Sequence, residues 1–253
     1  MEKLIIAFLL MTLTVPAWAS EKKSPKTTTA IEYVSPEQSV WTTRTYTNGE
    51  PVNPLLRVAE ILFSKADIPW RSHSYPAVRM FKSLQDGTAQ FSMLVKSPAL
   101  QECCLLSHKP VTVLQIRVYH LDGTTPIKNP NDLAGKNIIT ILGYSYGSLS
   151  RFLDDKHNRI NKNVVQTHAA AFKMLALRRA DYVIDYVGPA SEVLAATPIP
   201  GIRWEVLSKQ DVHLILAKNY PDAPKVMARL EAIAATIDIE KILWEAQLRS
   251  IHP

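Results

Sequence analysis

Strand-like and helix-like segments alternate along most of this 253-residue chain, and this alternation restricts its fold more than any other feature. The clearest segment is a helix in which Asn53 precedes Pro54 and apolar residues recur at helical spacing from Leu55 to Phe63. Strand-like segments lie on either side of it, at residues 31–35 and 70–75. Strands that alternate with helices of this length form a parallel or mixed sheet covered by helices, so the chain is predicted to be an α/β protein.

Two such α/β series follow each other, and turn residues between 122 and 132 separate them. The long strand-like runs at residues 111–120 and 212–217 are candidates for two strands that cross between two lobes. The crossing would return the C-terminal helical segment, from Pro221 onward, to the first lobe. The predicted organisation is a first lobe of residues 31–117 and 217–253 and a second lobe of residues 118–216.

The N-terminus has the layout of a cleavable secretory signal. Lys3 precedes an apolar run over residues 4–15, and the small-residue pattern Ala17-Trp18-Ala19 follows it. The run is too short for a membrane span, and no cysteine follows it where lipid attachment would need one. We predict a signal peptide over residues 1–19, cleaved after Ala19, then a polar tail over 20–30 and a periplasmic mature protein. An uncleaved N-terminal anchor is the alternative.

The charge of the chain does not indicate a nucleic-acid-binding protein. The formal net charge is +6 and the pI is about 9.2, which allows an anionic ligand or an acidic partner. The lysines and arginines are scattered, however, and form no stripe interleaved with aromatic residues. The two cysteines, Cys103 and Cys104, are adjacent. They are expected to be a buried small apolar pair, with a vicinal disulfide or a reactive thiol as the alternative.

Four segments, taken together, resemble a known family. They are the helix at 53–66 with its following strand, the Pro76-to-Arg79 helix that stops at Asp86-Gly87, the stretch 131–136 (Asn-Asp-Leu-Ala-Gly-Lys), and the helix and strand at 177–185. Their order and spacing over residues 31–236 are similar to those of the bacterial extracellular solute-binding proteins of family 3, which include polar amino-acid receptors of ABC importers. The resemblance implies a two-lobed periplasmic-binding-protein-like (type II) α/β fold whose lobes close on a ligand.

The resemblance and the ends of the predicted strands together give the candidate ligand-binding residues. Trp41 follows the first strand, where the family offers an aromatic platform, and Tyr46 is a weaker candidate for the same role. Arg79 matches the arginine of the family's proline-arginine helix, where it would hold a carboxylate or tie the helix to a neighbouring loop. Lys96 and Ser97 follow the strand at 89–95, at an end expected to face the cleft.

The second lobe contributes a loop and a strand end. Tyr144, Ser145 and Tyr146 lie between Gly143 and Gly147, in a loop expected either to line the cleft and hold an anion or to be only a tight turn. Asp185 resembles the family position that receives a ligand ammonium, and its alternative role is to cap a helix that starts near Pro189. Tyr186 would line the same wall.

One family position departs from the pattern of amino-acid receptors. Their carboxylate-binding arginine falls about seven residues before the serine that precedes the next strand, and counting back from Ser107 leads to Leu100. The usual amino-acid ligand is therefore in doubt.

The expected function is a monomeric protein that captures a small polar solute, for an inner-membrane ABC permease or for a sensor receptor. No metal or cofactor is expected, because no two histidines have the i, i+4 spacing of a helical metal site. An enzyme is the runner-up, as dehydratase-like chemistry on the same scaffold. It is disfavoured because no nucleophile elbow or Cys-His signature accompanies Cys104, His108 or His120.

Overall fold

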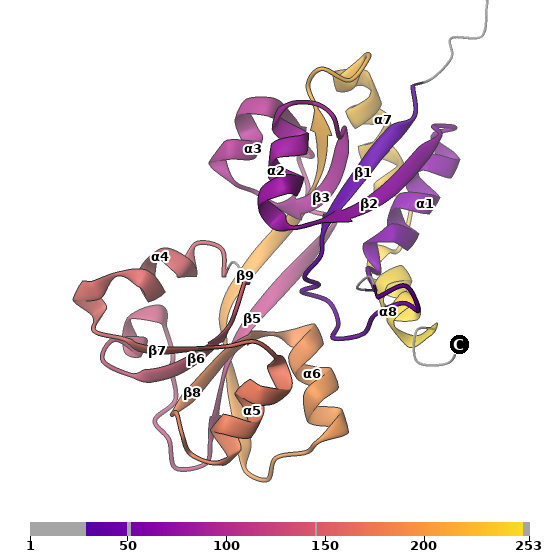
Figure 1. Cartoon of the computed structure of the whole chain (residues 1–253). Coiled ribbons are helices and arrows are strands. Elements are labelled where there is room, and N and C mark those ends of the chain that lie inside the picture. The colour runs from indigo at the N-terminus through magenta and orange to yellow at the C-terminus, as the bar shows by residue number, and fades with distance from the viewer. Residues whose placement is uncertain (1–28, 50–51, 145, 250–253) are drawn as a thin grey trace, which may run out of the picture.

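The computed structural model describes residues 29–49, 52–144 and 146–249 of the chain. The strands of this part follow one hydrogen-bonded path in the order β2-β1-β3-β9-β5-β8-β6-β7, and β4 pairs with β9 beside that path. Figure 1 shows that the strands and helices form two lobes joined by the long strands β5 and β9. The predicted signal peptide lies outside the described residues, as does the polar tail up to residue 28.

The first lobe contains both the early elements and the two C-terminal helices. Its elements are β1 (Ile31–Pro36), α1 (Leu55–Lys65), β2 (Trp70–Tyr75), α2 (Ala77–Gln85), β3 (Phe91–Val95), α3 (Pro98–Cys103), β4 (Cys104–Leu106), α7 (Ala223–Ala234) and α8 (Ile239–Arg249). Strand β1 pairs in parallel with both β2 and β3, as the βαβαβ order of the sequence requires. Helices α7 and α8 pack near α1, so the chain does return to the first lobe at its end (Figure 1).

The second lobe repeats the parallel arrangement with shorter helices. Its elements are the 3-10 helix η1 (Pro130–Leu133), β6 (Asn137–Ile141), α4 (Leu149–Asp154), the 3-10 helix η2 (Lys156–Asn158), β7 (Asn161–Val165), α5 (His168–Ala176), β8 (Tyr182–Tyr186) and α6 (Val187–Ala196). Strand β6 pairs in parallel with β7 and with β8. The Thr167 side chain accepts a hydrogen bond from the Ala170 backbone N–H, so Thr167 caps α5 as its sequence predicts.

Two antiparallel strands connect the lobes. Strand β5 (Thr112–Leu121) pairs with β9 (Ile202–Ala217) from Thr112 opposite Val212 to Leu121 opposite Ile202. The last residues of β9 pair with β3 and β4 of the first lobe, whereas β5 also pairs with β8 of the second lobe. The sequence pattern indicates one strand over residues 204–207 and another over 212–217, whereas β9 runs through both as a single strand. The expected lobe boundaries, after Arg117 and before Ala217, fall within β5 and at the last residue of β9. These boundaries remain a prediction.

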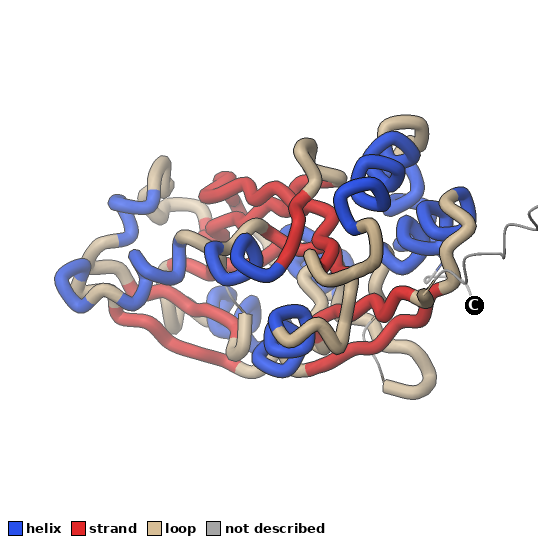
Figure 2. The backbone as a smooth tube through the Cα atoms, turned by 90° about the horizontal axis from the view of Figure 1, so that it is seen from above, coloured by secondary structure: helices blue, strands red, loops and turns tan. Residues whose placement is uncertain are grey.

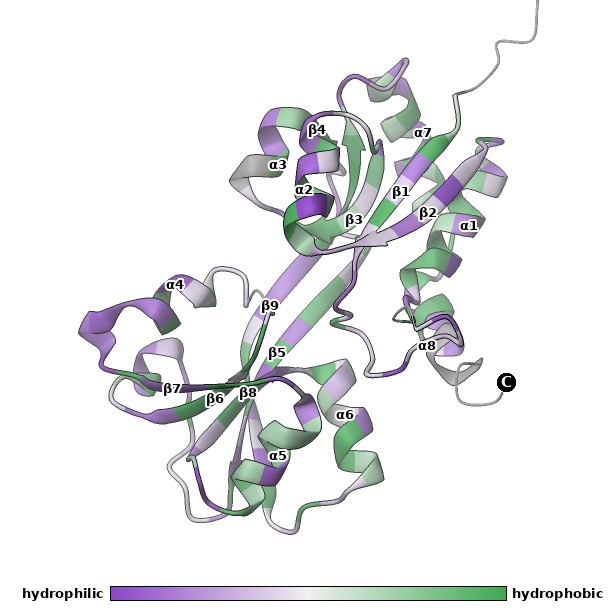
Figure 3. Cartoon of the chain, in the orientation of Figure 1, coloured by the Kyte–Doolittle hydropathy of each residue, from purple (hydrophilic) through white to green (hydrophobic). Residues whose placement is uncertain are grey.

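Apolar faces of the helices cover the sheet. Helix α1 buries Leu55, Val58, Ala59, Leu62 and Phe63, which are the residues that define its predicted apolar face. Figure 3 shows hydrophobic and hydrophilic residues alternating along α1, as expected for a helix with one buried side. In Figure 2, at right angles to the view of Figure 1, helices lie on both sides of the strands. Among the described residues, no helix is both long enough and apolar enough to cross a membrane.

The two cysteines lie where α3 passes directly into β4, two short elements that the sequence pattern did not indicate. Cys104 is buried and Cys103 is half-buried, with 2.9 Å between the two sulfur atoms. Burial and the neighbouring Cys103 thiol raise the pKa of the Cys104 thiol to about 12. As a thiol, Cys104 therefore has the low thiolate content of a structural cysteine.

Candidate functional site

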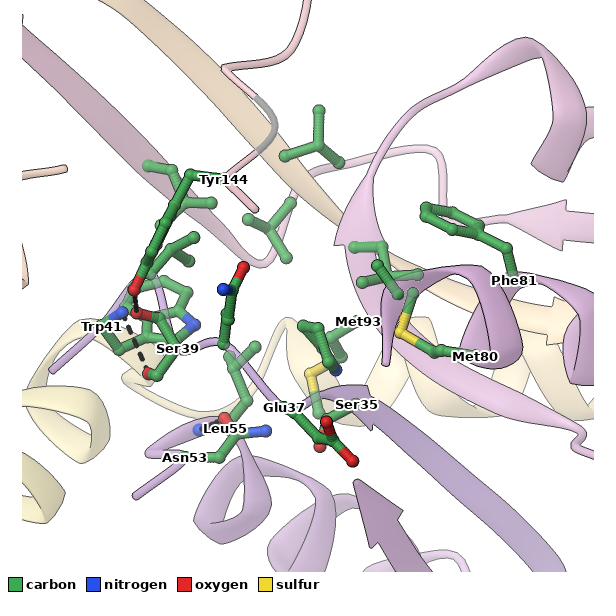
Figure 4. A pocket seen from close by; sticks show the side chains of 18 of the residues that line it. Ser35, Glu37, Ser39, Trp41, Asn53, Leu55, Met80, Phe81, Met93 and Tyr144 are labelled. Atoms are coloured by element: carbon green, nitrogen blue, oxygen red, sulfur yellow. Dashed lines mark hydrogen bonds between the residues drawn. The ribbon is translucent and has the colours of Figure 1, made fainter. Parts of the chain in front are cut away.

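A cavity of about 550 Å³ lies between the lobes and is lined by both of them. The first lobe contributes the end of β1 and the segment after it, the first residues of α1 and α2, and the end of β3. The second lobe contributes Gly143, Tyr144 and Gly147 of the turn after β6, and Tyr186 at the end of β8. Figure 4 shows Trp41 and Tyr144 on one side of this space and Met80, Phe81 and Met93 on the other. Its position and size are those of a small-molecule site.

The segment after β1 closes one side of the cavity by reaching the second lobe. The Gln38 Nε2 atom donates to the Leu142 carbonyl oxygen at 3.1 Å, and the Tyr144 hydroxyl donates to the Ser39 carbonyl oxygen at 2.8 Å. Figure 4 shows the second of these bonds. Both bonds join residues of different lobes, so they hold this side of the cavity closed in the structure.

A carboxylate on α6 makes the densest set of contacts between the lobes. Glu192 accepts hydrogen bonds from the Thr42 hydroxyl at 2.5 Å, from the Thr43 N–H at 2.6 Å and hydroxyl at 2.7 Å, and from Arg44 Nε and Nη2 at 3.0 and 2.8 Å. We call these four residues the interlobe clasp. Burial alone would raise the pKa of the Glu192 carboxyl, but these hydrogen bonds hold that pKa below its ordinary value.

The first turn of α6 comes so close to the first lobe that only glycine fits there. A Cβ atom on Gly188 would lie 2.1 Å from the Trp41 carbonyl oxygen, a backbone atom that cannot move aside like a flexible side chain. Gly188 therefore lets α6 approach the segment that carries Trp41, and this approach brings Glu192 within hydrogen-bonding distance of its partners in that segment.

A chain of polar groups runs from the interior of the second lobe to the same segment. The buried Asp185 Oδ2 lies 2.7 Å from His168 Nδ1, and His168 Nε2 lies 3.0 Å from the Tyr144 hydroxyl. That hydroxyl gives its proton to Ser39, so His168 Nε2 is the donor to Tyr144. One further proton must then lie between Asp185 Oδ2 and His168 Nδ1, because two bare acceptors 2.7 Å apart would repel each other.

Burial affects the ionisation of the same groups. It raises the pKa of Asp185 above its ordinary value, against the lowering effect of His168 and the Tyr186 N–H. It also raises the pKa values of Tyr144 and Tyr186, so both tyrosines are neutral at physiological pH. The second-lobe wall thus presents uncharged aromatic side chains to the cavity, while the Asp185 side chain is paired with His168 behind them.

Five of the ten residues predicted to bind ligand line this cavity. They are Trp41, Lys96, Ser97, Tyr144 and Tyr186. Trp41 and Ser97 are half-buried, Lys96 is exposed and Tyr186 is buried. The structure therefore brings together predicted residues from both lobes at one cavity, and their role in binding remains a prediction.

The other predicted residues lie elsewhere or outside the described part of the chain. Tyr46 is 44% exposed and does not line the cavity. Arg79 is exposed, with its guanidinium 4.2 Å from the centre of the Tyr75 ring, so it stacks within the first lobe. Tyr146 is buried, and its hydroxyl accepts from the Ile141 N–H at 2.8 Å. Ser145 lies outside the described residues.

Asp185 fits neither role that the sequence suggested. It is fully buried behind the cavity wall, paired with His168, and it accepts from the Tyr186 N–H at 2.7 Å. It does not cap α6 with its side chain, because α6 begins at Val187 and has no side-chain cap. The anion-binding role of the loop at 143–147 remains a prediction, because Ser145 lies outside the described residues and the helix that follows, α4, has only six residues.

Sequence reasoning missed several residues that shape the site. Met80 and Met93 line the cavity but read in the sequence as ordinary core residues of a helix and a strand. His168 and Glu192 act across long sequence separations, and no local motif marks them. Gln38 follows the first predicted strand, at a position to which the sequence pattern assigns no element.

The sequence matches no protein-family model and no curated protein. Solved structures nevertheless share its fold. A histidine kinase sensor domain described as similar to periplasmic binding proteins has a TM-score of 0.66 at 13% identity, covering 88% of this chain and 96% of its own. The GluR0 ligand-binding core in complex with L-glutamate has a TM-score of 0.65 at 10% identity, covering 87% of this chain and 98% of its own.

A substrate-binding protein of an ABC transporter has a comparable TM-score with this chain. The amino acid ABC transporter substrate-binding protein AbpA from Streptococcus pneumoniae, bound to L-arginine, has a TM-score of 0.63 at 13% identity, covering 88% of this chain and 96% of its own. These similarities show that the chain has the two-lobed fold of periplasmic binding proteins, as the resemblance seen in the sequence implied. At such identities the similarity establishes the fold alone, and the ligands of these proteins do not transfer with it.

Proposed function

We propose that this chain is a periplasmic solute-binding protein that captures a small solute between its two lobes. The observation that carries the proposal is the cavity between the lobes, walled by both of them and closed on one side by hydrogen bonds from one lobe to the other. A binding protein of this fold needs such an arrangement, because ligand capture must be coupled to lobe closure. The N-terminal signal pattern supports the proposed location.

The experiment that tests this proposal is native mass spectrometry of the secreted protein, followed by thermal unfolding with a broad set of small solutes. The expected result is a co-purified small molecule, or a solute that raises Tm with a dependence on its concentration. A panel that spans amino acids, organic acids, amines and sugars without any shift in Tm would contradict it. The intact mass of the same sample tests cleavage after Ala19.

Two partners are compatible with this role. An inner-membrane ABC permease would make the protein the receptor of an importer, and the similarity to a substrate-binding protein supports that role. A sensor receptor is the second candidate, supported by the similarity to a kinase sensor domain. Solute uptake and transcriptional response in a deletion strain separate the two, because only loss of import would abolish accumulation of labelled solute.

An enzymatic role has weaker support. The Asp185–His168 pair ends on the Tyr144 hydroxyl, which is bonded to the Ser39 carbonyl oxygen and is not presented to the cavity as a free nucleophile. Within the described part of the chain, no three His, Cys, Asp or Glu side chains are grouped to hold a metal. The solutes that shift Tm are to be recovered after incubation, since chemical conversion of any of them would favour an enzyme.

A further inference from the structure

The interlobe cavity has apolar walls on both sides. Figure 4 shows the aromatic rings of Trp41 and Tyr144 on one side of the space and the side chains of Phe81 and Met93 on the other. The Tyr186 ring, which also lines the cavity, packs against Tyr144 with 5.8 Å between the ring centres. A molecule that fills this cavity must therefore place most of its surface against carbon and sulfur atoms.

The two strands that connect the lobes provide a further surface of the cavity. Leu114 of β5 and Gln210 and Val212 of β9 line it, and all three are buried. Leu114 lies opposite Gln210 in the ladder between the strands. Gln210 and Val212 are two residues apart, so their side chains point to the same face of β9. Gln210 thus places an amide beside two apolar side chains.

The Gln210 amide has one end bonded and the other end open. Its Nε2 atom donates to the Tyr146 carbonyl oxygen at 3.1 Å, which fixes the orientation of the amide because only its nitrogen can donate. A Cβ atom on Gly147 would lie 1.9 Å from this nitrogen, so the glycine leaves the space that the amide occupies. The Oε1 atom accepts no hydrogen bond within the described part of the chain, yet it is not sealed inside the protein. It is therefore an acceptor that a molecule in the cavity can reach.

Other polar side chains of the lining offer less to a ligand. Ser35 Oγ shares a hydrogen bond of 3.1 Å with Ser74 Oγ, and Asn53 Oδ1 accepts from the Leu55 N–H at 3.0 Å. A ligand that bound such groups would only replace one hydrogen bond by another. The Ser97 hydroxyl is shut off from the cavity by the surrounding atoms. Gln210 Oε1 differs from these groups because it belongs to a residue that is only 7% exposed and still has room for a donor.

The lining has no buried charge that would hold an ionised ligand group. The charged side chains of its described residues are Glu37 and Lys96, which are both exposed and have opposite signs. An ion of either sign would be attracted by one and repelled by the other, and water screens both. Leu100 is buried where a carboxylate-binding arginine was expected, and Asp185 is paired with His168. A charged group would therefore lose its hydration without a buried partner of opposite sign, which is costly.

We propose that the cavity takes a small uncharged solute with an aromatic body and a hydroxyl or amide N–H group, which donates to Gln210 Oε1 while the body lies between Trp41 and Met93. This inference rests on the proposed binding function and narrows the small polar solute expected from the sequence to an uncharged, mainly apolar one. An aromatic body suits these walls because rings pack well against other rings and against the thioether of methionine.

Calorimetric titration with compounds that share one carbon skeleton tests the ligand class. They are 3-phenylpropan-1-ol, which is uncharged, 3-phenylpropionate, 3-phenylpropan-1-amine and phenylalanine, with arginine and glutamate as polar amino acids. We expect the alcohol to bind at least tenfold more tightly than each charged compound, because its binding removes no ion from water. Equal or tighter binding of any charged compound would overturn the proposal.

A second comparison tests the contact with Gln210. The methyl ether of 3-phenylpropan-1-ol keeps the body and the oxygen but has no proton to donate. The wild type should bind the alcohol about fivefold more tightly than the ether, as expected for one hydrogen bond between uncharged groups, and Gln210→Met should reduce this ratio to about one. The matched control Gln85→Met changes an exposed residue at the end of α2, outside the lining, and should leave the ratio unchanged.

The ratio of the two affinities separates a direct contact from a structural role. If Gln210→Met only loosened the cavity, the alcohol and the ether would lose affinity together and their ratio would remain as in the wild type, which would overturn the assignment of Gln210. A ratio of about one in the wild type would overturn it as well, and that measurement needs no variant to fold.

The outcomes also separate this inference from the binding function itself. If a charged amino acid or a sugar from the broad panel binds and the alcohol does not, the protein is a solute-binding protein and the ligand class proposed here is wrong. If neither these compounds nor the broad panel binds, the proposed function fails together with the inference that rests on it.

Discussion

Removal of the Glu192 carboxylate should open the lobes. Glu192→Ala deletes the acceptor of the five hydrogen bonds that cross from Thr42, Thr43 and Arg44. Hydrogen bonds to a charged acceptor contribute about 1.5 to 3 kcal/mol each in favourable cases. The Arg44 and Glu192 side chains retain 27% and 22% of their exposure, and water replaces these bonds when the lobes open, so their sum would be a large overestimate.

We expect Glu192→Ala to reduce the free energy of lobe closure by about 2 kcal/mol. This value is at the lower end of the cost of truncating one partner of a hydrogen-bonded charge pair. This corresponds to a change of about thirtyfold in the ratio of closed to open protein. The affinity for ligand should fall by up to the same factor, and by the full factor if the ligand-free protein is mainly open.

Small-angle X-ray scattering of the ligand-free protein, together with calorimetric titration of its ligand, measures both effects. The matched control is Glu32→Ala. The Glu32 side chain is 19% exposed and contacts Arg71 and His73, but all three residues lie in the first lobe. We expect Glu192→Ala to enlarge the radius of gyration or to weaken binding, whereas Glu32→Ala does neither. Equal behaviour of the two variants in both measurements would refute the idea that the clasp holds the lobes together.

Three further predictions concern single groups. Because the pKa of Glu192 is lowered in the closed form, its contribution to closure is complete above the ordinary glutamate pKa and is lost as the pH falls through the lowered value, so acidification below about pH 4.5 should weaken binding more in wild type than in Glu192→Gln. Asp185→Asn should change ligand affinity less than about threefold, because the residue lies behind the cavity wall, and a large loss of affinity in a stably folded Asp185→Asn would contradict this placement. Asp185→Ala should lower the free energy of unfolding, measured in urea, by about 3 kcal/mol. In the reduced protein Cys104 should resist alkylation at about pH 8 until it is unfolded, as measured by peptide mass spectrometry, and rapid modification of the native protein would show that the thiol is not buried.

The helices and strands of this chain could be predicted from local pattern because their apolar faces have clear periods. Helix α1 buries the residues that its spacing indicates, and β1 and β2 lie within one residue of their predicted ends. Strand β6 likewise ends one residue before the end of the segment 137–142 that the pattern indicates. Two features of the fold were not predicted. Helix α3 and strand β4 are too short to show a period, and β9 continues through polar residues 208–211 because β5 pairs with it there.

Contacts between the lobes were not predictable in the same way. The Glu192 carboxylate is about 150 residues from its partners, and nothing in the sequence near Glu192 indicates which surface it will meet. Only the placement of α6 against the segment after β1 joins them, and that placement depends on the absence of a side chain at Gly188. A glycine in the first turn of a predicted helix is a weak signal until the neighbouring backbone is known.

Asp185 shows how one residue of strand length changes the chemistry assigned to a site. The sequence placed the end of a strand at Asp185 and so directed its carboxylate to the cleft, whereas β8 extends to Tyr186. Successive side chains of a strand point to opposite faces, so Tyr186 reaches the cavity and Asp185 turns back to His168 on α5. The cavity thereby has an aromatic ring where an acid was expected. Together with Leu100 in place of an arginine, this exchange removes both charged contacts of an amino-acid receptor and favours an apolar body for the ligand.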